Sequence, residues 1–188
     1  METNPLDTLT ADEVTAATQR WLERAVIGLN LCPFAKAVHK KGQIRYVVSE
    51  ATQPLPLHDE LVRELKHLRD TDASVTDTTL IIHPHVLGDF MDFNEFLEIA
   101  DETVAELGLD GEIQVASFHP DFQFEGTMAD DITNYTNRSP FPTLHLLRED
   151  SIDKAVAAFP DASTIFEANM KTLDALGTQG WDALFAKP

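Results

Sequence analysis

Two histidines in this chain each follow a short apolar run and each precede a proline. His83-Pro84 comes directly after residues 79–82 (TLII), and His119-Pro120 comes directly after residues 113–118 (IQVASF). Because proline lacks a backbone donor and favours an extended residue before it, each histidine is expected at the end of a β-strand. If both strands are parallel, the imidazoles share one edge of the sheet, where either is a candidate general base. The alternative is that each His-Pro pair only ends a strand, with its ring bonded to a loop carbonyl.

The same histidines are candidate metal ligands. His83, His85 and His119 carry the imidazole nitrogens that zinc and other transition metals accept. His83 and His85 are separated by one residue, so their rings lie on one face only if that segment is extended. Cys32 is a candidate fourth ligand. The chain contains no HExxH motif and no paired Cys/His spacing that would support such a site independently.

Cys32 is the single cysteine of the chain and also precedes a proline. If Pro33 is the first residue of a helix, Cys32 is its N-cap, where free N–H groups and the helix dipole stabilise a thiolate. In that case Cys32 is a candidate nucleophile. The alternative is a buried thiol that acts as a small apolar side chain between Leu31 and Phe34.

A polar stretch without an obvious secondary structure follows the second His-Pro pair. It spans residues 121–142 and contains Asn137 and Arg138. Stretches of this length in compact domains are usually functional or disordered, and the aromatic residues within this one disfavour disorder. Arg138 is a candidate clamp for a carboxylate or phosphate, because its guanidinium matches both groups. The alternative is an internal ion pair with one of the acidic residues of the stretch, which are Asp121, Glu125, Asp130 and Asp131.

The elements that must position these residues alternate along the chain. Apolar residues at helical spacing separate short β-branched runs, a pattern typical of βαβ units. It predicts one α/β domain over residues 1–188, with a mainly parallel sheet of about four strands covered by helices. The fourth strand has no clear helix before it and is therefore a candidate antiparallel strand. A ferredoxin-like α+β arrangement is the main alternative. The predicted strands are residues 44–49, 79–82, 113–118 and 143–147.

Composition excludes several classes of function. Among 188 residues, 14 are Lys or Arg and 32 are Asp or Glu, which gives a formal net charge of −18. Such a charge argues against nucleic acid and against anionic membrane surfaces as partners. One cysteine excludes an intrachain disulfide. The chain shows no signal peptide and no apolar run long enough to span a bilayer, so a cytoplasmic location is expected.

Three segments together resemble a bacterial family of proteins of unknown function. They are residues 29–35 (LNLCPFA), 116–120 (ASFHP) and 134–149 (NYTNRSPFPTLHLLRE). The resemblance covers nearly the whole chain and implies a bacterial, single-domain, cytosolic protein. It implies no activity, cofactor or catalytic residue.

The leading hypothesis is an enzyme that acts on a small anionic molecule at the carboxyl ends of the strands. Cys32 is then the nucleophile, His119 the general base and Arg138 the anion clamp, and Asn137 supplies a hydrogen bond. The second hypothesis is a transition-metal site at His83, His85 and His119, the only cofactor that the residues suggest. The third is a binding module without catalysis.

Overall fold

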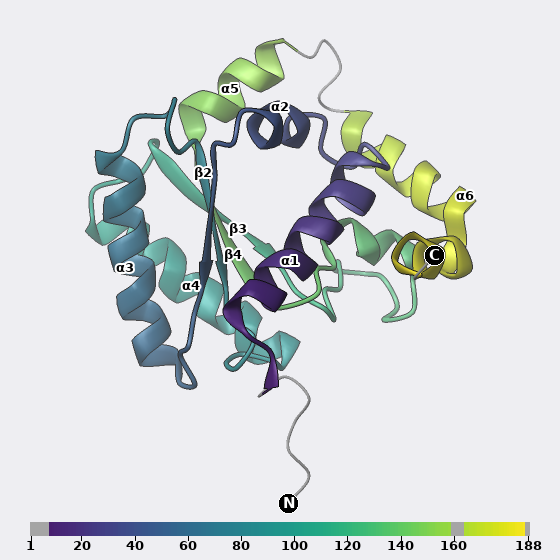
Figure 1. The fold of residues 1–188 in the computed structure, drawn as a ribbon, viewed down its shortest axis with the longest axis horizontal. Helices are drawn as coiled ribbons and strands as arrows, with labels where there is room; N and C mark the ends of the chain where they lie inside the picture. The colour runs from purple at the N-terminus through teal and green to yellow at the C-terminus, as the bar shows by residue number, and fades with distance from the viewer. Residues whose placement is uncertain (1–7, 159–163, 187–188) are drawn as a thin grey trace, which may run out of the picture.

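The computed structural model describes residues 8–158 and 164–186 (Figure 1). Its elements follow the order helix, strand, helix, strand through most of the chain. The strands are β1 (Ile44–Val48), β2 (Thr78–Ile82), β3 (Ile113–Phe118) and β4 (Thr143–Arg148). The α-helices are α1 (Ala11–Trp21), α2 (Ala35–Lys40), α3 (Pro54–Asp70), α4 (Phe90–Glu106), α5 (Glu149–Ala157) and α6 (Ile165–Phe185). A π-helical segment, η2 (Leu22–Ile27), continues α1, and a 3₁₀ segment, η3 (Ile132–Asn137), precedes β4.

The strands form one four-stranded sheet in the order β1-β2-β4-β3. β1 and β2 are parallel, whereas β4 is antiparallel to both of its neighbours, β2 and β3. The α/β class and the four strands are therefore confirmed, and so is the antiparallel fourth strand, but the mainly parallel pairing is wrong. The reason lies in the connection before β4. The chain leaves β3 at its carboxyl end and re-enters the sheet from that edge, so no crossover helix is needed and β4 runs back between β2 and β3.

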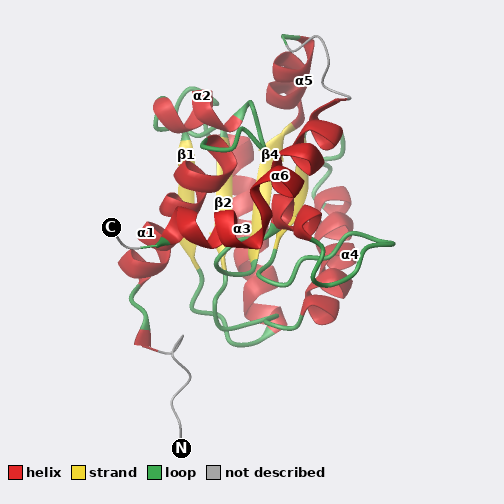
Figure 2. Ribbon diagram, turned by 90° about the vertical axis from the view of Figure 1, so that its right-hand side faces the viewer, coloured by secondary structure: helices red, strands yellow, loops and turns green. Residues whose placement is uncertain are grey.

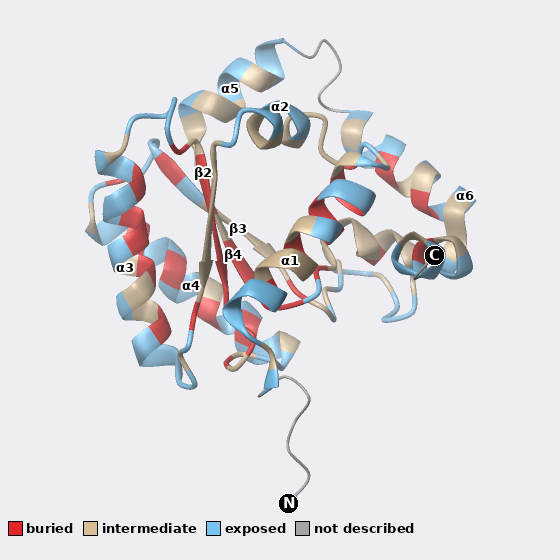
Figure 3. Cartoon of the chain, viewed as in Figure 1, coloured by how far each residue is buried: buried red, intermediate tan, exposed pale blue. Residues whose placement is uncertain are grey.

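Helices cover both faces of the sheet, and Figure 2 shows the strands running side by side between them. α3 and α4 pack on one face, where leucines of α3 and phenylalanines of α4 meet β2 and β4 (Figure 3). On the other face, α1 packs Val14 against Leu80 and Ile82, and α6 joins the end of α1 through Leu173 and Trp181. No helix in the described part of the chain is long and apolar enough to cross a membrane.

Side chains at the helix starts explain where α1 and α4 begin. Thr10 and Glu13 form the capping box at α1, with the Thr10 N–H donating to Glu13 at 2.9 Å and the Glu13 N–H donating to the Thr10 hydroxyl at 3.3 Å. At α4, the Asp89 carboxylate accepts the N–H groups of Met91 and Asp92. Both caps are local in sequence, so the starts of these helices can be read from a few neighbouring residues.

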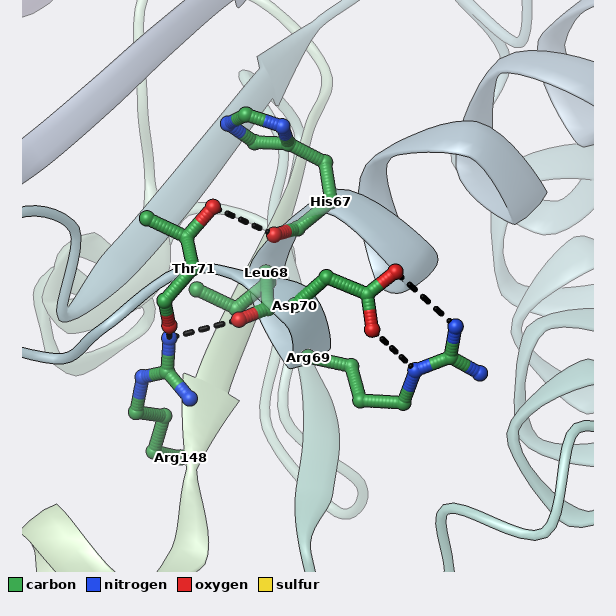
Figure 4. A network of polar contacts seen from close by, with 6 residues as sticks. All are labelled: His67, Leu68, Arg69, Asp70, Thr71 and Arg148. Atoms are coloured by element: carbon green, nitrogen blue, oxygen red, sulfur yellow. Dashed lines mark hydrogen bonds and ion pairs between the residues drawn. The ribbon is translucent and has the colours of Figure 1, made fainter.

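Arg148, at the end of β4, closes the carboxyl end of α3 (Figure 4). Its guanidinium donates to the carbonyl oxygens of Leu68, Thr71 and Thr76, which belong to the last turn of α3 and the connection to β2. Carbonyls at the end of a helix lack intrahelical partners, so a cation there satisfies them and also complements the helix dipole. Arg148 thus adds a polar connection between the sheet and α3 to the apolar packing between them.

Gly177 divides α6. Its φ of 66° and ψ of 174° are non-helical and lie in a region that only glycine occupies without strain. A Cβ at this position would meet nothing within 4 Å, so the requirement for glycine comes from the backbone alone. The residues after Gly177 take a new direction as a result, and they carry Trp181 and Phe185 onto the α1 side of the molecule.

Gly177→Ala is expected to lower the free energy of unfolding by about 1–3 kcal/mol, the cost of the left-handed backbone for alanine. Gly88→Ala is the matched control. A Cβ at Gly88 also meets nothing within 4 Å and its φ is not positive, so this variant should unfold at the wild-type midpoint or slightly above it. Urea unfolding followed by circular dichroism measures both. Equal effects of the two substitutions would contradict the strain argument.

Candidate functional site

His83 and His119 lie at the same edge of the sheet, as the sequence indicates, but not on neighbouring strands. β2 and β3 run in the same direction, and β4 separates them. The Phe93 ring of α4 stands between the two imidazoles, with centroid distances of 5.6 Å to His83 and 5.1 Å to His119. Both histidines are fully buried. They belong to the packed layer beneath α4.

Both ring nitrogens of His119 have backbone partners. Nδ1 accepts the N–H of Asp121 at 3.0 Å, so Nε2 carries the proton and donates to the carbonyl of Leu87 at 3.2 Å. Burial lowers the pKa of His119 and favours this neutral form. No nitrogen remains to take a proton from a substrate or a thiol. This arrangement is the alternative considered from the sequence, a His-Pro pair whose ring is bonded to a loop carbonyl.

In His83, only one of the two ring nitrogens is bonded to the backbone. Its Nδ1 donates to the carbonyl of Val86 at 3.0 Å, and its buried Nε2 has no hydrogen-bond partner among the described residues. Burial lowers the pKa of His83 to about 4. His85, two residues on, is half-buried. Within residues 8–158 and 164–186, no three His, Cys, Asp or Glu side chains come close enough to hold a metal ion, so His83, His85 and His119 do not form a ligand set.

Cys32 does not cap a helix. α2 begins at Ala35 with Phe34 as its N-cap, and the Ala35 N–H donates to the Cys32 carbonyl in a turn before the helix. The expected N-cap at Cys32 is therefore wrong, because Pro33 lies in this turn and not in the first helical turn. The half-buried Cys32 packs with Leu31, Ala35 and Tyr46 in the apolar cluster on the α1 side of the sheet. His119 contacts Phe90 and Phe93 of α4, on the other side, so the two are not brought together.

The stretch 121–142 is folded and not an open loop. Buried Asn134 organises it, because its Oδ1 accepts from the Phe124 N–H and the Thr127 hydroxyl while its Nδ2 donates to the Met128 carbonyl. Asn137 connects the stretch to β3 by donating to the Ser117 carbonyl at 3.1 Å. The amide of Asn137 is thus engaged in holding the fold.

Arg138 is fixed by the same stretch. Its Nε donates to the Phe122 carbonyl at 3.1 Å and its Nη2 to the Ala129 carbonyl at 2.6 Å. The guanidinium lies over the Tyr135 ring, 4.5 Å from its centroid. In the described part of the chain no carboxylate lies within 4 Å of it, so Arg138 keeps its positive charge without the internal ion pair considered as the alternative.

A hollow of about 470 Å³ lies beside Arg138. α1 contributes Arg20 and Trp21 to it, and the segment after Gly177 contributes Trp181 and Phe185. Arg20 is exposed and has no carboxylate within ion-pair distance among the described residues. The lining as a whole is two cations, four aromatic rings and small or apolar side chains: Ala17, Arg20, Trp21, Pro120, Tyr135, Arg138, Ser139, Pro140, Trp181 and Phe185. Its volume suits a small organic molecule.

The family of the chain follows from a comparison with family models. The model described as "Protein of unknown function (DUF1415)" matches residues 13–183. The chain belongs to this family. No curated protein and no solved structure matches it. The range matched by DUF1415 includes every residue that lines the hollow except Phe185.

In this DUF1415 protein, the sequence identified Arg138 as a candidate anion-binding residue but did not identify the other residues that line the hollow. Pro120 and residues 135 and 138–140 come from two of the segments that carried the family resemblance. Arg20, Trp21 and Trp181 come from opposite ends of the chain, and only the packing of α6 on η2 and η3 places them together. The signal available in the sequence was the tryptophan content. The chain has only two tryptophans, and both line the hollow.

A second hollow of this DUF1415 protein, of about 490 Å³, lies where β1 meets α3. Its lining includes Glu50, Asp59 and Glu60 with one cation, Arg63, which pairs with Glu60 at 3.7 Å. Three carboxylates against one paired arginine repel anions. The hollow beside Arg138 has the opposite character, because it presents two arginines and no carboxylate.

Proposed function

We propose that this DUF1415 protein binds a small organic anion in the hollow between Arg20 and Arg138. One observation carries the proposal. Two arginines without a carboxylate partner in the described structure line one hollow of a chain whose net charge is −18. Most lysines and arginines of the described residues have no carboxylate within 4 Å, so what distinguishes Arg20 and Arg138 is that both line the same aromatic-walled hollow. Cations left available in an aromatic-walled hollow are suited to an anionic ligand.

The fixed position of Arg138 supports binding further. Two backbone carbonyls and the Tyr135 ring hold its guanidinium, so little side-chain freedom remains to be lost when a ligand arrives. Arg20 is exposed and free to adjust to the anion. The pair combines a positioned donor with a solvent-exposed one.

Binding, and not catalysis, is what this geometry supports. Cys32 and His119, expected as nucleophile and base, do not line the hollow, and both nitrogens of His119 are bonded to the backbone. The one hydroxyl of an aliphatic side chain in the lining belongs to Ser139, and it donates to the Phe141 carbonyl at 2.6 Å. We therefore retain the small anionic molecule of the sequence hypothesis as the ligand and place it at a binding site.

Tryptophan fluorescence tests the proposal, because both indoles border the hollow. Phenylacetate and its neutral analogue phenylacetamide are titrated against the wild type, Arg20→Gln, Arg138→Gln and the control Arg69→Gln. Arg69 is an exposed arginine paired with Asp70, away from the hollow. Removal of a charged donor to a carboxylate is expected to weaken phenylacetate binding about 10-fold or more.

The control variant should bind phenylacetate as the wild type does, and phenylacetamide should bind weakly to all four proteins. Arg138→Gln also loses two bonds to the stretch 121–142, so its fold is checked by circular dichroism. If Arg138→Gln is unfolded, the phenylacetate affinity of Arg20→Gln alone tests the proposal. Equal affinity for the acid and the amide would refute anion binding at this site.

A further inference from the structure

We infer that the ligand of this hollow is an aromatic monocarboxylic acid, whose flat ring packs against Trp181 and Tyr135 while its carboxylate meets Arg138 and Arg20. This inference rests on the proposed function and specifies the ligand class. Three features carry it: the character of the walls, the part of Arg138 that remains available, and the net charge of the chain.

Four of the ten residues that line the hollow are aromatic. Trp181 stands edge-on to Tyr135, with 5.0 Å between ring centroids and 79° between ring planes, and it contacts Phe185 at 5.7 Å. Aromatic rings attract one another at centroid distances of about 4.5–7 Å in tilted or edge-to-face arrangements, beyond the effect of burial alone. Ring faces and edges that border an open hollow offer the same contact to a further ring. A saturated body of similar size fills the space but lacks this attraction.

Arg138 offers only part of its guanidinium to a ligand. Nε and Nη2 donate to the carbonyls of Phe122 and Ala129, and one face of the guanidinium lies over the Tyr135 ring. Both N–H groups of Nη1 and the second N–H of Nη2 have no acceptor among the described residues, so these three donors are left for an anion. Together with the exposed Arg20, these donors suit the two oxygens of a carboxylate.

The charge of the chain selects against a second negative charge on the ligand. At −18, the protein repels every anion at long range, and a dianion is repelled more strongly than a monoanion. The attraction to the two arginines doubles as well for a dianion, but the cost of taking it out of water more than doubles, so a single charge is the less costly one to bind. A carboxylate is therefore favoured over a phosphate monoester, which carries close to two charges at neutral pH.

A series of matched compounds tests the inference at pH 7.5 by tryptophan fluorescence and calorimetry. Phenylacetate is compared with cyclohexylacetate, which keeps the acid but not the flat ring, and with phenyl phosphate, which keeps the ring but adds charge. Benzoate and indole-3-acetate cover smaller and larger rings. The best aromatic acid is expected to bind about 3- to 10-fold more tightly than cyclohexylacetate, the range that aromatic pairing provides. Phenyl phosphate is expected to bind at least about threefold more weakly than phenylacetate.

Trp181→Leu tests the position of the ring. It should remove the preference for phenylacetate over cyclohexylacetate and leave the preference for acid over amide. Trp181 is largely buried, at 8% exposure, so Phe185→Leu, at an exposed position of the same wall, provides a second variant that is expected to fold and to reduce the preference. Arg20→Gln should do the reverse, weakening every acid while keeping the preference for the flat ring.

The outcomes separate the inference from the proposed function. Equal affinity for phenylacetate and cyclohexylacetate would contradict the inference that the ligand has an aromatic ring. Tighter binding of phenyl phosphate than of phenylacetate would contradict the inference that its charge is a single carboxylate. In both cases binding of an anion would still stand. If the amide binds as well as the acid, or if no acid binds by about 10 mM, both the inference and the proposed function fail.

Discussion

Replacing Arg148 by methionine is expected to lower the free energy of unfolding by about 3 kcal/mol and the melting temperature by roughly 6–12 °C. Arg148 is half-buried and donates to the carbonyls of Leu68, Thr71 and Thr76. Methionine keeps the apolar stem and removes every donor. The carbonyls of fully buried Leu68 and of buried Thr76 then lose a charged partner, and a buried acceptor without a partner costs about 1–3 kcal/mol.

Figure 4 also provides the control for this prediction. Arg69 lies at the end of the same helix and makes two bonds to the carboxylate of Asp70. Both side chains are exposed, and exposed pairs of this kind contribute little to stability. Arg69→Met should therefore unfold at the wild-type midpoint. Arg148→Lys, which keeps the charge but loses the planar array of donors, should fall between the wild type and Arg148→Met.

Thermal and urea unfolding measure all three variants. If Arg148→Met lowers the free energy of unfolding no more than Arg69→Met does, the role assigned to Arg148 is contradicted. Such a result would mean that water satisfies the three carbonyls as well as the guanidinium does.

The sequence predicted most of the fold because its signals are local. The apolar runs before His83 and His119 and the run at residues 143–147 locate three strands to within a residue of their observed ends. The capping box at the start of α1 is also local, because Thr10 and Glu13 stand three residues apart in the sequence. The order of the strands in the sheet depends on where the chain returns after β3. Nothing in the residues of β4 indicates that this strand lies between β2 and β3.

The candidate site could be predicted only in part. Arg138 was identified because it is a lone cation in an acidic stretch, a contrast visible in the sequence. Arg20 and Trp181 carry no such contrast, since an arginine on a helix and an apolar residue at helical spacing are common features of any amphipathic helix. His119 was assigned a catalytic role from residue type, but the carbonyl of Leu87, which occupies its Nε2, comes from another connection. Leu87 adopts a φ of 56°, a conformation that its side chain does not indicate.

The stability of the protein is expected to depend on pH through His83. Burial lowers its pKa from 6.5 to about 4, so the folded state favours the neutral ring. Above pH 6.5 the ring is neutral in both states and its contribution to stability is complete. As the pH falls below 6.5, the unfolded chain takes up a proton that the folded protein does not, and the contribution is lost progressively toward pH 4. Between pH 7.5 and 5.0 the loss amounts to about 2 kcal/mol.

His83→Asn isolates this contribution, because asparagine can still donate to the Val86 carbonyl in place of Nδ1 but does not titrate. The difference in free energy of unfolding between wild type and variant should fall by about 2 kcal/mol from pH 7.5 to 5.0. Protonation of the acidic surface and of buried His145 affects both proteins alike and cancels in the difference.

His67→Asn, at an exposed position of α3, should leave the wild-type pH dependence unchanged. A constant difference between wild type and His83→Asn across this range would show that the buried ring takes up its proton without unfolding, with Nε2 reaching water that the packing around Phe93 excludes in this structure.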